Sequence, residues 1–337
     1  MERHPSDSSR PAVTVIVCTR DRPAHLQSCL DALALQVYSN FDILVVDNAS
    51  AEPVDEICRA RGASCIHEPV PGLTRARNVG AHAACGELIA YIDDDALPEP
   101  GWLEALVLEF SDPTVAAVAG RTRYMNARGD SLFMSDEPAA DSDGLRPRRS
   151  FHRRTQDWFA LACFGGIGDG NTMAFRRHAI VKLSGFDERL GRGRVLEGGD
   201  EHVAFMSLIA AGYSVNYTPD AAVRHPMPAT PALRRDKLKR DLRASIAYVL
   251  FLWAEFPAHR GDLARFLGRA MLRRLSNARV SGSGLARLSR PQAMMAVLGG
   301  VRTYWKARQE WVAHPQPAER EPNPAMAPFA STASRAR

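Results

Sequence analysis

Short apolar runs rich in β-branched residues recur along the first part of the chain and alternate with segments of helical periodicity. The runs predict strands at 13–18, 41–46, 63–67, 88–92 and 115–119. Between them, leucines recur at intervals of three and four residues, as at Leu26, Leu30 and Leu33, and predict helices. Strands that alternate with helices at this spacing predict an α/β fold with a doubly wound, mainly parallel sheet.

The pattern changes after the fifth predicted strand. Residues 126–157 are rich in Asp, Ser, Arg, Pro and Gly and lack periodicity, which predicts a flexible loop or insertion. Regular structure returns beyond it as a strand, a helix beginning, a longer helix and two short strands, predicted at 172–176, 178, 200–211, 213–217 and 221–224. The predicted sheet domain therefore contains this loop and extends through the strand predicted at 221–224.

The chain beyond the predicted sheet domain is helical and basic. Residues 232–311 contain 17 Lys and Arg against five Asp and Glu, a net charge of +12, so the rest of the chain carries −7. Apolar residues recur at helical spacing at 246–256, 263–275 and 294–305. This basic amphipathic region favours an anionic membrane surface as its partner. The alternatives are a helical bundle packed on the sheet domain and nucleic-acid binding, for which the sequence has no zinc-finger or RNP-like motif.

The ends of the chain and its cysteines indicate the compartment. Residues 1–11 are polar and lack the apolar core of a signal peptide, residues 314–337 are rich in Pro and Ala, and both segments are predicted to be disordered. No apolar run approaches the ~20 residues that span a bilayer. The six cysteines lack CxxC spacing, which is typical of reduced thiols. We therefore expect a cytoplasmic protein, either soluble or peripheral on the inner face of the cytoplasmic membrane.

Three consecutive carboxylates, Asp93, Asp94 and Asp95, follow the apolar strand predicted at 88–92. Ligands of α/β sheets gather at the carboxyl ends of the strands, and the alternation of side chains places Asp93 and Asp95 on one face. Two charges ~4 Å apart repel by ~4 kcal/mol at an effective dielectric constant of about 20. The cluster therefore favours a bound Mg²⁺ or Mn²⁺. The alternative is a solvated acidic turn before a helix at 99–110.

Polar residues also follow three other predicted strands: Thr19, Arg20 and Asp21 the first, Asp47 the second, and His225 the last. In a wound sheet these groups can meet in one crevice. Asp47 is placed either to accept hydrogen bonds from a base or ribose or to form an Asx-turn. The sequence contains neither GxGxxG after the first strand nor GxxxxGK[ST], which disfavours a nicotinamide dehydrogenase and a P-loop protein.

Six short motifs occur in a fixed order along the chain. They are Val-Ile-Val-Cys-Thr-Arg-Asp-Arg-Pro, Val-Val-Asp-Asn-Ala-Ser, Gly-Leu-Thr-Arg-Ala-Arg-Asn-Val-Gly, Tyr-Ile-Asp-Asp-Asp, Gly-Asn-Thr-Met-Ala-Phe-Arg-Arg and Gly-Phe-Asp-Glu. Together they resemble the family 2 glycosyltransferases, over residues 12–226. The resemblance implies a Rossmann-like GT-A domain with residues 232–311 as a C-terminal helical appendage. It also implies an inverting enzyme that uses a UDP, GDP or TDP sugar and a divalent metal.

The resemblance implies roles for individual residues. The nucleotide-sugar site would be formed by Thr19, Arg20, Asp21, Asp47, Arg75, Asn78, Asp93 and Asp94. Within it Asp47 would contact the base and Asp94 the ribose side. The metal would be held by Asp95, with Asp93 and His225, although His225 can also be read as a surface histidine at a strand end. Asn171 would face the acceptor cleft, and its alternative role is to form a turn.

The catalytic base is expected in the Gly-Gly-Asp-Glu-His-Val segment that begins at Gly198. The family usually reads Gly-Glu-Asp, an unspecified residue, Asp and Leu, and the Asp of the pair is the base. Here the two acids are swapped and Val203 replaces the later Asp. Register assigns the base to Glu201, although Asp200 is chemically suitable. The alternative is that both acids only favour the first turn of a helix.

Three functions follow from these observations. The first is transfer of a sugar to a hydroxyl of a glycan or lipid-linked acceptor in cell-envelope or exopolysaccharide synthesis. Its chemistry needs a cation for the charge on the departing diphosphate and a carboxylate base for the hydroxyl. The second is a sugar-phosphate nucleotidyltransferase, which predicts a Gly-rich triphosphate loop that residues 19–23 lack. The third is a non-catalytic family member that binds nucleotide and membrane. Nucleic acid is not an expected partner.

Overall fold

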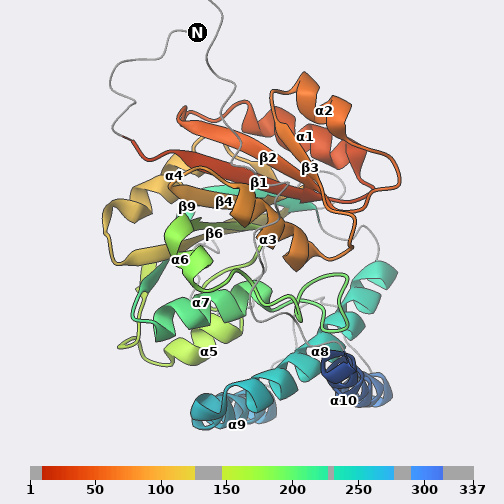
Figure 1. The fold of residues 1–337 in the computed structure, drawn as a ribbon. Helices are drawn as coiled ribbons and strands as arrows, with labels where there is room; N and C mark the ends of the chain where they lie inside the picture. The colour runs from red at the N-terminus through yellow and green to blue at the C-terminus, as the bar shows by residue number, and fades with distance from the viewer. Residues whose placement is uncertain (1–9, 126–145, 227–230, 277–289, 314–337) are drawn as a thin grey trace, which may run out of the picture.

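A single sheet runs through the centre of the molecule (Figure 1). The computed structural model describes residues 10–125, 146–226, 231–276 and 290–313. Within these ranges the strand order is β3-β2-β1-β4-β8-β6-β9-β5, and β7 pairs with β9. The strands are β1 Val13–Thr19, β2 Phe41–Asp47, β3 Ser64–His67, β4 Leu88–Asp93, β5 Leu97–Pro98, β6 Val115–Met125, β7 Arg149–Phe151, β8 Thr172–Arg176 and β9 Ser214–Pro226.

The direction of the strands confirms an α/β fold with a mainly parallel central sheet. Strands β1 to β4 are parallel to one another, and β6 is parallel to β9. Strand β8 lies antiparallel between β4 and β6. The carboxyl ends of β1, β2 and β4 therefore lie at the same edge of the sheet, where ligands of such sheets bind.

Helices cover both faces of the sheet. Helices α1 Pro23–Leu33, α2 Asp55–Ala60 and α4 Trp102–Leu108 share one core with Val13, Val15 and Val17 of β1. Ile16 points to the other core, which contains residues of α3 Leu73–Ala83, α5 Trp158–Cys163, α6 Arg177–Lys182 and α7 Asp200–Ala210. Burial of alternate residues on both faces explains why the strands are continuous apolar runs.

Helix α3 packs unusually close to the sheet. A Cβ atom at Gly80 would lie 2.7 Å from Cγ2 of Ile16 in β1 and 3.3 Å from Cγ2 of Val46 in β2. The glycine therefore allows the helix to approach the two strands, and it fixes which face of α3 is turned toward them.

Three long helices follow the sheet domain. They are α8 Pro231–Glu255, α9 Arg260–Ser276 and α10 Arg290–Ala313. Tyr248 and Phe251 of α8 belong to the same core as α3 and α7, so this region packs on the sheet domain. Helices α8 and α10 lie side by side (Figure 1) and touch at Gly300, where an added Cβ would lie 2.6 Å from Cβ of Ile246. In the described part of the chain no helix combines the length and the apolar character needed to cross a membrane.

The structure differs from the sequence-based expectation in three places. One strand, β9, replaces the two predicted at 213–217 and 221–224, because residues 218–221 bulge opposite Gly120 and pairing with β6 then resumes. Strand β7 lies within the loop predicted at 126–157. Predicted disorder at the N-terminus does not extend to Arg10, which pairs with Glu104 at 2.7 Å. The segments 1–9, 126–145 and 314–337 lie outside the described residues.

Candidate active site

A cavity of about 250 Å³ opens at the carboxyl ends of β1 and β4. Five of the residues singled out in the sequence line it: Thr19, Arg20, Asp93, Asp94 and Asp95. The same cavity is lined by Arg22 and Arg192, to which sequence reasoning gave no role. Acids and arginines thus meet in one pocket, where they can bind a cation and phosphate oxygens together.

Asp94 ties the ends of the two central strands together. Its carboxylate is buried and accepts a hydrogen bond from Thr19 Oγ1 at 2.8 Å and one from Arg22 Nη1 at 3.2 Å. Burial raises the pKa of Asp94, and the bond from Thr19 opposes that rise. Asp94 therefore faces Thr19, and it shares Arg22 Nη1 with Asp95, whose Oδ2 lies 2.9 Å from the same nitrogen.

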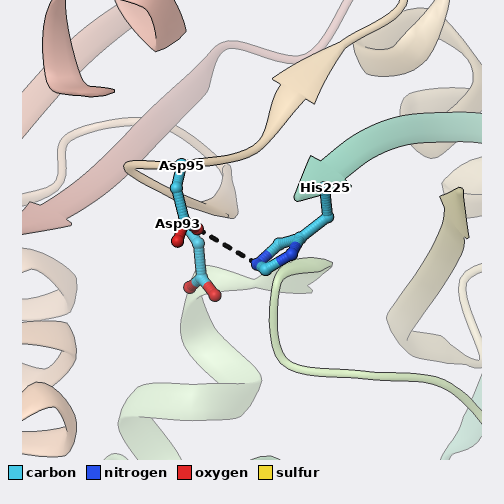
Figure 2. Close-up of side chains that lie close together, drawn as sticks. All are labelled: Asp93, Asp95 and His225. Carbon is cyan, nitrogen blue, oxygen red and sulfur yellow. Dashed lines mark ion pairs between the residues drawn. The ribbon is translucent and has the colours of Figure 1, made fainter. Parts of the chain in front are cut away.

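Asp93, Asp95 and His225 converge from two elements of the sheet, as Figure 2 shows. Their ligand atoms lie within 4.8 Å of one another, and His225 Nε2 is 3.0 Å from Asp95 Oδ1. The pairing of β5 with β9 explains the meeting, because Leu97 lies opposite Arg224 in an antiparallel register. That register brings the turn after β4 beside His225.

Asp95 and His225 each stabilise the charged form of the other. Burial acts to raise the pKa of Asp95, but the hydrogen bond and charge of His225 outweigh it and lower the pKa to about 2. Burial acts to lower the pKa of His225, and Asp95 raises it above its usual value. Two carboxylates and an imidazole with room for water fit a divalent cation such as Mg²⁺ or Mn²⁺.

Arg77 joins the metal-side acids to helix α7, and sequence reasoning missed it. Its guanidinium is buried, lies 2.7 Å from Asp200 Oδ2 and 3.5 Å from Asp93 Oδ1, and donates to the Gly170 carbonyl at 2.8 Å. The signal for Arg77 is its spacing from Gly80. Three residues apart, both lie on the face of α3 that approaches the sheet.

The two candidate bases have different environments. Burial acts to raise the pKa of Asp200, but the charge of Arg77 outweighs it, so the pKa lies below its usual value. Burial raises the pKa of Glu201 to about 7, and Asp200 adds to the effect. The Glu201 side chain is 15% exposed, and a Cβ at Gly170 would lie 3.1 Å from its Cδ. Asp200 is therefore held as an ionised partner of Arg77, whereas Glu201 exchanges a proton near neutral pH.

Asn171 lies immediately before β8, next to the carbonyl that Arg77 contacts. It is buried, and its Oδ1 accepts a hydrogen bond from Thr122 Oγ1 at 2.8 Å. Its backbone thus follows directly on Gly170, which packs against Glu201.

Asp21 and Asp47 stabilise turns beside the cavity. Asp21 Oδ1 accepts a hydrogen bond from the Ala51 amide at 2.7 Å, and Asp47 Oδ1 accepts one from the Ser50 amide at 3.1 Å. Asp47 Oδ2 is buried and has no hydrogen-bond donor among the described residues, with His67 Nδ1 3.5 Å away. One oxygen of Asp47 thus forms the turn and the other is left as an acceptor.

Arg75 and Asn78 contact the turn after α6 and do not line the cavity. Arg75 Nη1 lies 3.8 Å from Glu188 Oε2 in this turn, and its Nε lies 2.9 Å from Glu68 Oε1 after β3. The Asn78 amide donates to the Phe186 carbonyl at 2.9 Å and to Glu188 Oε1 at 3.0 Å. This turn leads into the segment 191–199, and Arg192 and Gly193 from that segment form one wall of the cavity.

Known proteins share sequence with this chain. The family model described as Glycosyl transferase family 2 matches residues 14–183. Pre-mycofactocin glycosyltransferase of Mycobacterium tuberculosis is 30% identical over 228 residues, which cover 66% of this chain and 44% of that protein. Glycosyltransferase AglE of Haloferax volcanii is 26% identical over 227 residues, which cover 65% of this chain and 68% of that protein. The chain thus spans less than half the length of the mycobacterial relative.

Solved structures share its fold. Mannosyltransferase PcManGT from Pyrobaculum calidifontis in complex with GDP-Man and Mn²⁺ matches with a TM-score of 0.56 and 22% identity, covering 91% of this chain and 84% of that chain. S. aureus TarS 1-349 in complex with UDP-GlcNAc matches with a TM-score of 0.53 and 15% identity, covering 90% and 92%. These likenesses confirm the GT-A architecture.

Proposed function

The chain belongs to glycosyl transferase family 2, and on this premise we propose that it is an inverting, metal-dependent enzyme that moves a sugar from a nucleotide-diphosphate sugar to a hydroxyl. One observation carries the proposal. The acids and histidine of a candidate metal site line or border the cavity, and Arg77 connects Asp93 of this site to Asp200, whose neighbour Glu201 has a pKa of about 7.

The donor would occupy the cavity between Thr19 and Arg192. Related folds hold GDP-Man, UDP-GlcNAc and UDP, which supports a UDP, GDP or TDP sugar as donor. Asp47 Oδ2, buried without a donor among the described residues, is suited to accept a hydrogen bond from the base. Arg22 and Arg192 supply positive charge beside the acids and would contact the diphosphate.

The metal would be held by Asp93, Asp95 and His225. A bound Mg²⁺ or Mn²⁺ stabilises the negative charge that develops on the diphosphate as it leaves. The Mn²⁺ present with PcManGT supports this choice. His225 must lose its proton to act as a ligand, while Arg22, 2.9 Å from Asp95 Oδ2, keeps that carboxylate oriented.

Glu201 is the proposed base. The acceptor oxygen attacks the anomeric carbon on the face opposite the nucleoside diphosphate, the bond to the diphosphate oxygen breaks, and the hydroxyl proton passes to Glu201. A base with a pKa near 7 combines a useful ionised fraction with a strong pull on the proton. Asp200 stays paired with Arg77 and orients the start of α7, and Asn171 lies on the acceptor side.

We further propose a glycan or lipid-linked acceptor and a peripheral position on the inner face of the cytoplasmic membrane. Helix α10 exposes an apolar row at helical spacing: Met294, Leu298, Val301, Trp305 and Val312. Such a row flanked by arginines is typical of a helix that lies on an anionic membrane. This placement would suit cell-envelope or exopolysaccharide synthesis.

Calorimetric titration with UDP, GDP and TDP, with and without Mn²⁺, tests the proposal. We expect one diphosphate to bind only with Mn²⁺, and Asp95→Ala to abolish binding. Asp31→Ala, which removes an exposed carboxylate paired with Arg61, is the control and should bind as the wild type does. Absence of binding by any diphosphate would contradict the site.

Sugar transfer separates catalysis from binding. In an assay with the matching nucleotide sugar, Glu201→Gln should bind the diphosphate normally and lose transfer. Diphosphate binding without transfer by the wild type to any acceptor would instead favour the non-catalytic alternative. Family membership already disfavours the sugar-phosphate nucleotidyltransferase.

A further inference from the structure

A second cavity, of about 520 Å³, lies between α8, α10 and the segment 191–199. Its lining is strongly basic. The charged side chains are those of Arg194, Arg240, Arg243, Arg302 and Lys306, with Glu197 as the acid. Cations from three separate parts of the chain therefore face one space.

Most of this charge is not neutralised by the protein. Among the residues that the structure describes, Arg240, Arg243 and Arg302 form no ion pair with a carboxylate. Lys306 lies 3.8 Å from Glu310, and Arg194 lies 3.7 Å from Glu188. A cleft lined by charges of one sign concentrates the field and attracts the opposite ion.

The packing of the two helices builds this cavity. At Gly299 an added Cβ would lie 3.2 Å from Cδ of Arg243, so the arginine stem crosses α10 where there is no side chain. At Gly300 an added Cβ would lie 2.7 Å from the Arg243 carbonyl oxygen. The glycine pair thus brings Arg243 and Arg302 of neighbouring helices to one opening.

The segment 191–199 separates this cavity from the donor cavity. Arg192 and Gly193 line the donor cavity, while Arg194, Val195 and Glu197 line the second one. We propose that the second cavity binds the phosphate or diphosphate group of a ligand other than the nucleotide sugar. Guanidinium groups match phosphate oxygens in paired hydrogen bonds, and five cations against one acid suit a group with more than one negative charge.

The phosphate group can belong to a lipid headgroup or to a soluble phosphate compound. Calorimetric titration of the full chain with inorganic pyrophosphate tests the shared chemistry, in EDTA so that metal-dependent binding in the donor cavity does not contribute. We expect Arg243→Gln/Arg302→Gln to raise the Kd at least about tenfold, because charged hydrogen bonds to phosphate are lost.

A matched control removes two charges from the same helices outside the cavity. Arg235→Gln/Arg308→Gln should leave the Kd within about twofold if the cavity, and not overall charge, binds the anion. Arg243→Lys/Arg302→Lys keeps the charge and should give an intermediate Kd. Equal weakening by both Gln pairs, or no binding by the wild type, would overturn the proposal.

Vesicle flotation tests whether the phosphate group belongs to a lipid headgroup or to a soluble compound. Vesicles of phosphatidylcholine with phosphatidic acid are compared with vesicles of phosphatidylcholine alone. Binding to the former that is lost in Arg243→Gln/Arg302→Gln and displaced by pyrophosphate would support the site and assign a lipid headgroup. Pyrophosphate binding without such vesicle binding would support the site and assign a soluble ligand.

Discussion

Replacing Arg77 by methionine removes the guanidinium that joins Asp93, Gly170 and Asp200 and keeps a side chain of similar length. The Asp200 carboxylate is then left buried, 3% exposed, without the cation that lies 2.7 Å away. Removing one partner of a buried ion pair costs about 3–5 kcal/mol. We therefore expect Arg77→Met to lower the free energy of unfolding by about this amount.

A double-mutant cycle separates the ion pair from general packing. Arg77→Met/Asp200→Asn removes both charges, so its loss should be smaller than the sum of the single losses by at least about 1 kcal/mol. The matched control is Arg61→Met. Arg61 also lies 2.7 Å from its partner, but Asp31 is 59% exposed, so the loss should stay below about 1 kcal/mol.

Urea unfolding followed by tryptophan fluorescence measures all four variants. If Arg77→Met costs no more than Arg61→Met, or if the Arg77 and Asp200 losses simply add, burial of the Arg77–Asp200 pair does not stabilise the fold as argued.

Three further predictions follow. Since the pKa of Glu201 is about 7, kcat/KM for sugar transfer should fall about tenfold per pH unit below that value, where the base is protonated, and a flat pH-rate profile would contradict this. His225→Gln should weaken Mn²⁺ binding by at least about tenfold in calorimetry, and unchanged affinity would remove His225 from the metal site. Gly80→Ala should cost about 1–3 kcal/mol of stability, because its Cβ would lie 2.7 Å from Ile16 Cγ2. A Cβ at Gly268 in α9 would meet no atom within 4 Å, so Gly268→Ala should raise the stability by about 0.5–1 kcal/mol. If Gly80→Ala and Gly268→Ala changed the stability in the same direction, the packing described here would be contradicted.

The sheet could be predicted because each strand is recognisable from a short apolar run in the sequence. The run at 88–92 is apolar since β4 is covered on both faces, and Asp93 to Asp95 follow it since the strand ends at the ligand-binding edge. Asp94, next along the chain, faces Thr19 at the end of the neighbouring strand β1. These features depend on a few consecutive residues.

The remaining features depend on pairings between distant segments. The resemblance assigned His225 to the metal site, but nothing near it in the sequence indicates that a two-residue strand would bring it beside Asp95. Arg77 has no local feature that distinguishes it from other helical arginines. Only the close contact at Gly80 shows that the face of α3 that carries Arg77 is turned toward the sheet. The local sequence does predict a break before residue 221. Because β9 pairs with β6 on both sides of the bulge, the two predicted strands form one strand.

The short pairing of β5 with β9 ties together parts of the chain more than a hundred residues apart through two register positions, Leu97 with Arg224 and Pro98 with Val223. Such a short pairing opens locally at little free-energy cost. A cation held by both Asp95 and His225 would bind only the closed form, and at a hundred times its Kd would stabilise that form by about 2.7 kcal/mol. Amide hydrogen exchange at Leu97 and at Glu99, whose amide donates to the Ala222 carbonyl, would then slow on addition of Mn²⁺. The ion would act as a reversible cross-link between the two halves of the sheet.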